Sequence, residues 1–309
     1  MKLLLPFLAL LFSFTSAQAL DKTESHLTIQ EVTKDVYAIV GDLGNRTAEN
    51  LGNNATFGVV VTSEGVVLID SGGTYLGAQR IDKLIKTITK KPVVTVINSG
   101  GQDHRWLGNS YFKKQGAQII ASEDAVEDQK ARSQDQFFML GNFIGDDGLK
   151  GTDAVHAEKT FKQEFKFKLG DTDFEIYHVG QAHTPGDSYI WLPQKKLMFT
   201  GDIVYVERML GVGPQSNSKS WLNVFKSMAA YKPEYLVPGH GKATSLAHAT
   251  KDTYDYLVFL RKSITDFMDD DGELSEISKV DQSKFNYLKN YESISGRNAQ
   301  QVFTEMEFE

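Results

Sequence analysis

Four short segments of this sequence place a histidine or an aspartate on a turn directly after an apolar run. Their chemistry-bearing residues are the adjacent pair Asp103-His104, then His183, Asp202 and His240. Imidazole nitrogens and carboxylate oxygens are ligands for zinc and similar divalent ions. One such segment alone is weak evidence for a metal site. An Asp-His pair more often caps a helix, and a Gly-His-Gly sequence usually only forms a turn. Four of them in one chain favour a metal site.

The elements that would position these side chains are predicted from the sequence around each segment. The pair follows the strand-forming run V-V-T-V-I at residues 93–97 and a turn rich in Ser, Gly and Gln, and a helix is expected at 106–115. The other three lie in the turns G-Q-A-H-T-P-G-D, T-G-D and P-G-H-G, each after an apolar strand. Because glycine permits a sharp turn, we expect these side chains at the rim of a sheet rather than inside it.

The remaining pattern predicts a layered α/β fold. Val-rich runs at 57–62 and 65–70 form a hairpin that ends at Asp70, which marks either the edge of a site or a simple Asx turn. Residues 75–90 form an amphipathic helix, and another strand follows at 118–121. A second group of short strands is expected at 165–169, 174–178, 188–192 and 197–200. Strands alternating with helices in this way indicate sheets covered by helices.

Two regions are less regular. Residues 41–56 are rich in Asn and Gly and are expected to form a mobile loop. Residues 122–160 predict a helix followed by a loop that overhangs the site, or else a locally packed apolar turn around 137–140. Helices are expected at 218–231 and 246–267, and a helical tail at 273–309.

The first 19 residues have the pattern of a secretory signal peptide. Lys2 precedes an apolar run, and an A-x-A site ends at Ala19, after which we expect cleavage. The mature protein would be periplasmic or secreted, with no stable membrane insertion after cleavage. The chain has no cysteine, which excludes disulfides, thiolate ligands and a cysteine nucleophile.

The net charge limits the kinds of partner that the protein can have, and the chain length limits the number of domains. The sequence has 33 Lys and Arg against 40 Asp and Glu, a net charge of -7, with no basic cluster. This argues against nucleic acid and favours a small-molecule substrate; the sequence identifies no protein partner. We expect a main domain at 20–262 and a C-terminal helical extension at 263–309 packed on it.

Together, Asp70, Asp103-His104, the H-T-P-G-D at 183–187, Gly201-Asp202 and the P-G-H-G at 238–241 resemble the motifs of the metallo-β-lactamase superfamily. The resemblance covers about residues 27–262 and implies an αββα sandwich, two mixed β-sheets flanked by helices, with a metal site along one edge. It implies that His240 joins the Asp and His of an H-x-H-x-D-H motif in one metal site. His183 and the two earlier histidines would form the other site, and Asp202 would bridge both. Asp70 would orient a ligand histidine.

This chain lacks the H-x-H half of that motif. If Asp103 and His104 are the motif's D-H, its two histidine positions hold Ser99 and Gly101. This register is preferred because it keeps two competent ligands, and it requires one residue lost before the pair and one gained after it.

An ungapped match is the alternative. It puts Gly100 and Gln102 at the two histidine positions, and His104 and Arg105 at the positions of the motif's Asp and His. Under either register the site that needs His183 has lost its other two histidines.

The surviving residues predict a hydrolase with one divalent metal ion: zinc, with manganese or iron as alternatives. Asp103, His104, Asp202 and His240 would hold it, with His183 close by. The ion would lower the pKa of a water that attacks an ester, lactone or amide-type bond, with Asp103 or Asp202 as general base. The alternative is a catalytically degenerate member of the family that acts as a periplasmic binding or accessory module. The segment 296–307 is loosely similar to exported quinoprotein-associated zinc metallohydrolases.

Overall fold

The computed structural model describes residues 26–309. The predicted signal peptide, residues 1–19, lies outside the described residues. Within residues 26–309, no helix combines the length and the apolar character needed to cross a bilayer.

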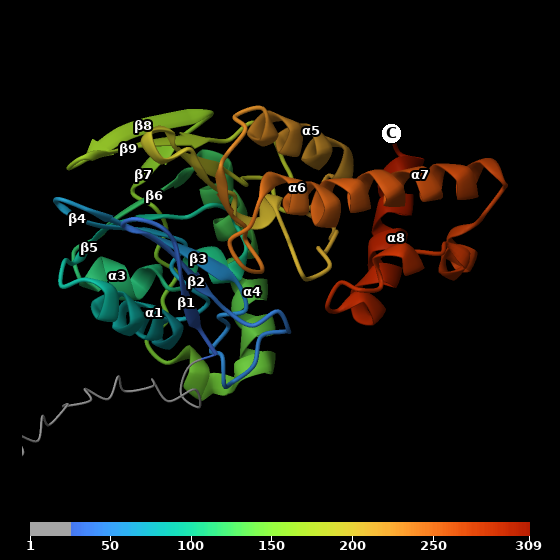
Figure 1. The fold of residues 1–309 in the computed structure, drawn as a ribbon. Helices are drawn as coiled ribbons and strands as arrows, with labels where there is room; N and C mark the ends of the chain where they lie inside the picture. Colours follow the sequence, from blue (N-terminus) through green and yellow to red (C-terminus); the bar gives the residue numbers. More distant parts are fainter. Residues whose placement is uncertain (1–25) are drawn as a thin grey trace, which may run out of the picture.

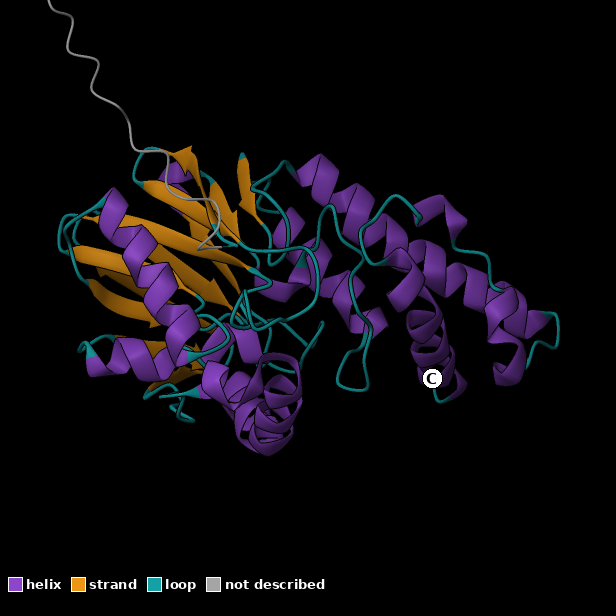
Figure 2. Cartoon of the chain, turned by 90° about the horizontal axis from the view of Figure 1, so that it is seen from below, coloured by secondary structure: helices purple, strands orange, loops and turns teal. Residues whose placement is uncertain are grey.

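Two β-sheets pack against each other, helices cover their outer faces, and the C-terminal helices extend to one side of this sandwich (Figure 1, Figure 2). The seven-stranded sheet contains, in spatial order, β1 (Thr28–Thr33), β2 (Val36–Val40), β3 (Thr56–Thr62), β4 (Gly65–Ile69), β5 (Val93–Ile97), β6 (Gln118–Ser122) and β7 (Lys159–Phe161). The five-stranded sheet contains β12 (Tyr235–Val237), β11 (Leu197–Phe199), β10 (Tyr189–Leu192), β9 (Thr172–Tyr177) and β8 (Glu164–Leu169). Both sheets are mixed: β4 to β7 are parallel neighbours, as are β11 and β12, and the other pairs are antiparallel.

Side chains that alternate along each strand build three apolar layers. In β4, Val66 and Leu68 pack outward against helix α1 (Tyr75–Ile88), whereas Val67 and Ile69 pack inward against the second sheet. The outer face of the second sheet packs against α5 (Ser218–Ala229) and α7 (Asp255–Asp269). Strands apolar on both faces are expected for sheets that are covered on both sides. The predicted αββα sandwich is confirmed.

The region 122–160 differs from the expected helix and loop. A helix, α4, runs over Glu123–Leu149, begins at a cap in which Ser122 Oγ accepts from Ala125 N at 3.1 Å, and kinks at Gly145, where φ is 72°. Its apolar residues occupy no single stripe, so periodicity did not reveal its length. Met139 and Phe143 are 50% and 45% exposed and overhang the site from a helix, not from a loop.

The other expected helices are interrupted. The helix expected at 106–115 is divided into α2 (Asp103–Trp106) and α3 (Asn109–Lys114). The helix expected at 246–267 consists of α6 (Leu246–Ala249), a π-helical turn η3 (Thr250–Tyr254) and α7.

The C-terminal segment packs on the second sheet's helical layer. It contains η4 (Leu274–Lys279), η5 (Ser283–Phe285) and α8 (Tyr291–Glu307), and it lies beside α7 on the side away from the first sheet (Figure 1). Val302 and Phe303 of α8 belong to the same apolar cluster as Trp221 of α5. The domain boundary expected after residue 262 falls inside α7.

Candidate functional site

The rim of the sandwich is formed by the carboxyl ends of strands from both sheets. In the first sheet β4 and β5 are parallel neighbours, and they lead into Asp70 and into the turn before α2. In the second sheet β11 and β12 are parallel neighbours, and they lead into Asp202 and His240. Because parallel strands end at the same edge of a sheet, these turns lie close together, as at the ligand sites of other α/β proteins.

Three of the predicted ligands form one buried cluster at this rim. His104 Nε2 lies 3.2 Å from Asp202 Oδ2, and His240 Nε2 lies 3.1 Å from Asp202 Oδ1. The ligand atoms of the three residues all lie within 4.8 Å of one another. Two imidazoles and a carboxylate at this spacing offer a possible metal site.

A fully buried arginine neutralises the carboxylates next to the cluster. Arg105 donates from Nε and Nη2 to the two oxygens of Asp202, at 3.1 and 2.7 Å, and from Nη1 to Asp70 at 2.9 Å. Burial alone would raise the pKa of Asp202, but the charge of Arg105, together with the contact from His104, outweighs burial and holds that pKa well below its usual range. At Asp70 burial prevails over Arg105 and over the hydrogen bonds from Ser99, and the pKa is raised. Arg105 therefore keeps Asp202 ionised and fixed in place.

Asp103 contacts the other nitrogen of His104. Its Oδ1 lies 3.2 Å from His104 Nδ1, and both of its oxygens accept hydrogen bonds from Arg46, with 2.6 Å between Nε and Oδ2. Burial alone would raise the pKa of Asp103, but the charge of Arg46 and the contact with His104 together outweigh burial. The pKa is therefore well below its usual range and the carboxyl is ionised. Arg46 Nη2 also lies 3.0 Å from His104 Nδ1, and a guanidinium only donates, so in this arrangement Nδ1 accepts and Nε2 donates to Asp202. For Nε2 to bind a metal ion the proton must move to Nδ1, where Asp103 can accept it.

His240 has a different neighbour at its second nitrogen. His240 Nδ1 lies 3.1 Å from Nη1 of Arg208. A guanidinium only donates, so Nδ1 accepts here and the proton lies on Nε2, directed at Asp202. Burial and then the charge of Arg208 lower the pKa of His240 well below its usual range, so the ring is neutral. For Nε2 to bind a metal ion the proton must move to Nδ1, and Arg208 must turn away.

With the protons of both imidazoles on Nδ1 and Arg208 turned away, the donor set of the cluster suits a single zinc-type ion. Metal–ligand distances of about 2.0–2.1 Å place the ligands of a tetrahedral ion roughly 3.3 Å apart. The 3.1 and 3.2 Å separations run from the two imidazoles to different oxygens of Asp202, so binding both rings to one ion requires a shift of Asp202 or of the rings. A carboxylate has about four acceptor sites, of which Arg105 takes two.

His183 lies outside the cluster, on the wall of an adjoining cavity. Its Nδ1 is 2.9 Å from the carbonyl oxygen of Gly211 and donates to it, so Nε2 keeps its lone pair. The ring packs edge-on against Tyr205 and Trp221. Burial lowers the pKa of His183 to about 4, and the ring is neutral at pH 7.

The ungapped register assigns Gly100 and Gln102 to the positions of the missing histidines. Position 100 has no room for a side chain, and Gln102 is a weak metal ligand. A Cβ atom on Gly100 would lie 2.4 Å from Oδ1 of Asp187, so no side chain fits there without movement. Asp187 is held by Thr184, whose backbone N and Oγ donate to it at 2.7 and 2.6 Å. Burial raises the pKa of Asp187 to about 8. Gln102 shares the cavity wall with His183, but an amide oxygen is a poor zinc ligand.

The contacts of residues 103–105 bear on the register of the motif. His104 contacts Asp202, as either register expects, and Arg105 contacts it as well. Asp103, a ligand in the preferred register, is not part of the cluster and is occupied by Arg46.

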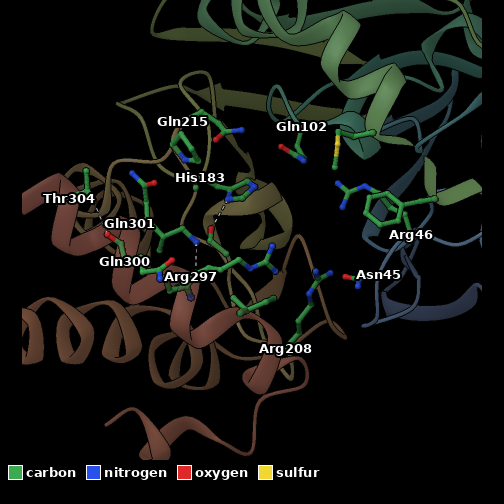
Figure 3. A pocket seen from close by; sticks show the side chains of 18 of the residues that line it. Asn45, Arg46, Gln102, His183, Arg208, Gln215, Arg297, Gln300, Gln301 and Thr304 are labelled. Atoms are coloured by element: carbon green, nitrogen blue, oxygen red, sulfur yellow. Dashed lines mark hydrogen bonds between the residues drawn. The ribbon is translucent and has the colours of Figure 1, made fainter. Parts of the chain in front are cut away.

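A cavity of about 840 Å³ adjoins the cluster (Figure 3). This volume lies within the range of roughly 300–1,000 Å³ typical of small-molecule sites. Arg46 and Gln102 line it beside His183, Arg208 lines it from the loop after η2 (Gly201–Ile203), and Arg297 lines it from α8.

Helix α8 fixes the loop that forms part of this cavity wall. Asn298 is buried, accepts from Val212 N at 2.7 Å and donates to the Leu210 carbonyl at 2.8 Å. Gly211, which holds His183, lies between these two residues. The C-terminal segment is therefore part of the site's structure.

Sequence reasoning assigned no role to Arg46 and Arg208, and it considered Arg105 only as the residue at the motif's His position in the ungapped register. Arg105 had a usable signal, since it directly follows the Asp-His pair. Arg46 lies in the segment expected to be a mobile loop, and Arg208 belongs to no motif. Their roles depend on contacts between segments far apart in the chain.

The comparisons with known proteins agree with this fold. The family model described as the metallo-beta-lactamase superfamily matches residues 52–240. The chain is 24% identical over 238 residues to the metallo-beta-lactamase type 2 of Elizabethkingia meningoseptica, which covers 75% of this chain and 86% of that protein. It is 25% identical over 235 residues to metallo-beta-lactamase IND-1 of Chryseobacterium indologenes, covering 75% of this chain and 87% of that protein.

Two solved structures show the extent of the shared fold. A metallo-beta-lactamase from Pontibacter korlensis has a TM-score of 0.59 at 22% identity, covering 75% of this chain and 99% of that one. The sec-alkylsulfatase Pisa1 from Pseudomonas sp. has a TM-score of 0.67 at 17% identity and covers 90% of this chain, but 50% of that one. The second match extends into the C-terminal helices. With a family match over more than half of its length and the αββα fold, the chain belongs to the metallo-beta-lactamase superfamily.

Proposed function

We propose that this protein is an exported hydrolase that works with one divalent metal ion, held by His104, Asp202 and His240. Zinc is the proposed ion, with manganese or iron as alternatives. The observation that supports this most is the spacing of the cluster, with each imidazole Nε2 at 3.1–3.2 Å from an oxygen of Asp202. The substrate is a small molecule with an ester, lactone or amide-type bond.

The chain's own residues would prepare the site for that ion. When bound, the ion would supply a Lewis acid and lower the pKa of a coordinated water. Asp103 would orient His104 through Nδ1, and Arg105 would hold Asp202 by its two hydrogen bonds. A general-base role for Asp103 or Asp202 requires that Arg46 or Arg105 release one of the carboxylate oxygens that they now occupy.

His183 would act on the substrate side of the site. Its Nε2 has a lone pair, and the ring is neutral because burial lowers its pKa to about 4. It therefore accepts a hydrogen bond from a group bound in the cavity, and it is a weak base.

The second candidate function is a binding or accessory module without catalysis. It is favoured by the contacts of Arg105 and Arg208, which satisfy Asp202 and His240 without a metal ion, and by the loss of the H-x-H histidines. Fold alone does not separate the two functions.

The test is metal content measured by elemental mass spectrometry on protein purified without chelator. We expect about one metal ion per chain in the wild type, loss of that ion in His104→Ala and His240→Ala, and retention in the matched control His183→Ala. Hydrolysis of ester, lactone and lactam panels is then measured on the loaded protein and on His240→Ala.

The outcomes separate the candidates. No metal, even after reconstitution with excess ions, would reject the hydrolase and leave the binding module. Loss of metal in His183→Ala, or about two ions per chain, would show that His183 contributes to a second site that the cluster alone does not predict.

A further inference from the structure

A buried arginine without a carboxylate partner lines the cavity. Arg208 is only 7% exposed. Among the described residues its guanidinium has one hydrogen-bond partner, His240 Nδ1, and its Nε has none. Buried charges in proteins are normally paired, because an unpaired polar group in the interior costs free energy. On its cavity side, Arg208 therefore has no neutralising side chain among the described residues.

Two further arginines line the same cavity. Arg46 is neutralised by Asp103, whereas Arg297 of α8 uses only Nε, which donates to the Ser293 carbonyl at 3.1 Å. The described residues that line the cavity include no Asp or Glu. In a chain with a net charge of -7, this is a local excess of positive charge. Figure 3 shows Arg208 and Arg297 reaching into the cavity from different segments.

The cavity also has an apolar wall. Met139 and Phe143 of α4 are 50% and 45% exposed, and Leu274 of η4 is 42% exposed. All three line the cavity. Exposed large apolar side chains grouped around one opening mark a surface for an apolar ligand group.

We propose that the cavity binds a small amphipathic anion, with a carboxylate, sulfate or phosphate monoester group between Arg208 and Arg297 and an apolar chain against Met139, Phe143 and Leu274. This deepens the proposed function by naming the substrate class, and it rests on that function only for calling the ligand a substrate. Planar guanidinium groups pair with such anions through two parallel hydrogen bonds. An anion that draws Arg208 away from His240 also frees Nδ1 for the tautomer that metal binding requires.

The test is calorimetric titration of the full mature protein with octanoate, octyl sulfate, octyl phosphate and neutral octanol. We expect at least one of the three anions to bind at least about tenfold more tightly than octanol, because hydrogen bonds from a guanidinium to an anion are stronger than those to a neutral hydroxyl. The preferred anion identifies the head group. Arg297→Gln, which touches none of the proposed metal ligands, is expected to weaken anion binding by a similar factor, as is Arg208→Gln. Arg80→Gln on α1 removes the same charge outside the cavity and is the matched control.

Equal affinity for octanol and the anions, absence of binding, or unchanged affinity in both Arg208→Gln and Arg297→Gln would each overturn the proposal. Binding is measured without turnover, so a protein that binds anions but holds no metal would reject the proposed hydrolase and keep this inference. A fivefold molar excess of chelator in a parallel titration separates the two results.

Discussion

The two halves of the rim differ in how their charges are matched. Around Asp202 every charged group has a partner: two imidazoles and Arg105 contact the one carboxylate, and the side chains are almost fully buried. Around His183 the groups face a cavity, and Arg208 has no carboxylate partner among the described residues. In the half around Asp202, the charges of the chain neutralise one another. In the half around His183, the positive charge of Arg208 is available to a bound anion.

The histidine that the ungapped register expects at position 100 could not be restored by substitution alone, because a neighbouring side chain occupies the space that it would need. Gly100 lies against Asp187, whose carboxyl is fixed by Thr184. A histidine side chain at position 100 would therefore meet a carboxyl that is held in place. A single ion beside Asp202 is compatible with this arrangement, and a second ion beside His183 has only one histidine to hold it.

The largest expected effect comes from breaking the matched half. Arg105→Met leaves Asp70 and Asp202 buried without their shared counter-charge, and we expect a loss of about 3–5 kcal/mol in the free energy of unfolding. Urea denaturation measures this. Lys113→Met, which removes an exposed ion pair to Glu158, is the control and should cost about 1 kcal/mol or less. Equal costs for the two substitutions would contradict the view that Arg105 is the central charge of this half.

The next prediction tests whether one histidine of the missing H-x-H pair can be restored in the half around His183. Gly100→His is expected to destabilise the protein by about 1–3 kcal/mol, because even its Cβ would lie 2.4 Å from Asp187 Oδ1. Thermal denaturation is compared with that of Gly44→His, where a Cβ would meet no atom within 4 Å. We expect no gain of a second metal ion in Gly100→His. An undestabilised variant that binds two ions would show that the space is adaptable.

A smaller effect is expected from the support of the cavity wall. Asn298→Ala leaves the Val212 N–H and the Leu210 carbonyl without their partner, at a cost of about 1–3 kcal/mol. Chemical denaturation is compared with that of Asn286→Ala, an exposed asparagine in the same segment. Equal stability of the two variants would indicate that α8 does not hold this loop.

The most gradual effect concerns pH. The pKa of His183 is lowered to about 4 in the folded protein, whereas the ordinary value is about 6.5. Between these values the unfolded chain binds a proton that the folded chain excludes, so stability falls as the pH is lowered from 6.5 to 4. One proton changes the slope by at most about 1.4 kcal/mol per pH unit. His183→Gln should flatten the profile of unfolding free energy over this window, and parallel profiles would contradict the assignment.

Much of the architecture was predictable because it depends on local patterns. The hairpin of β3 and β4, helix α1 and strand β5 follow from apolar periodicity and turn residues. The placement of Asp202 and His240 at the rim follows from the rule that turns after parallel strands meet at one edge. The length of helix α4 was under-predicted because its apolar residues form no regular stripe. Helices α2 and α3 were predicted as one helix, because the break at Gly108 depends on tertiary contacts. A Cβ atom at Gly108 would lie 2.0 Å from the Ser71 carbonyl oxygen.

The sequence by itself determined the fold class and the set of histidines and aspartates that are available for chemistry. Tertiary structure alone decided which of them meet. It directed Asp103 to Arg46 instead of to the cluster, and it left His183 facing a cavity. The physical reason is charge compensation: a buried carboxylate or guanidinium must find its partner across the fold, and the partners of Asp202 and Asp103 lie 97 and 57 residues away in the chain.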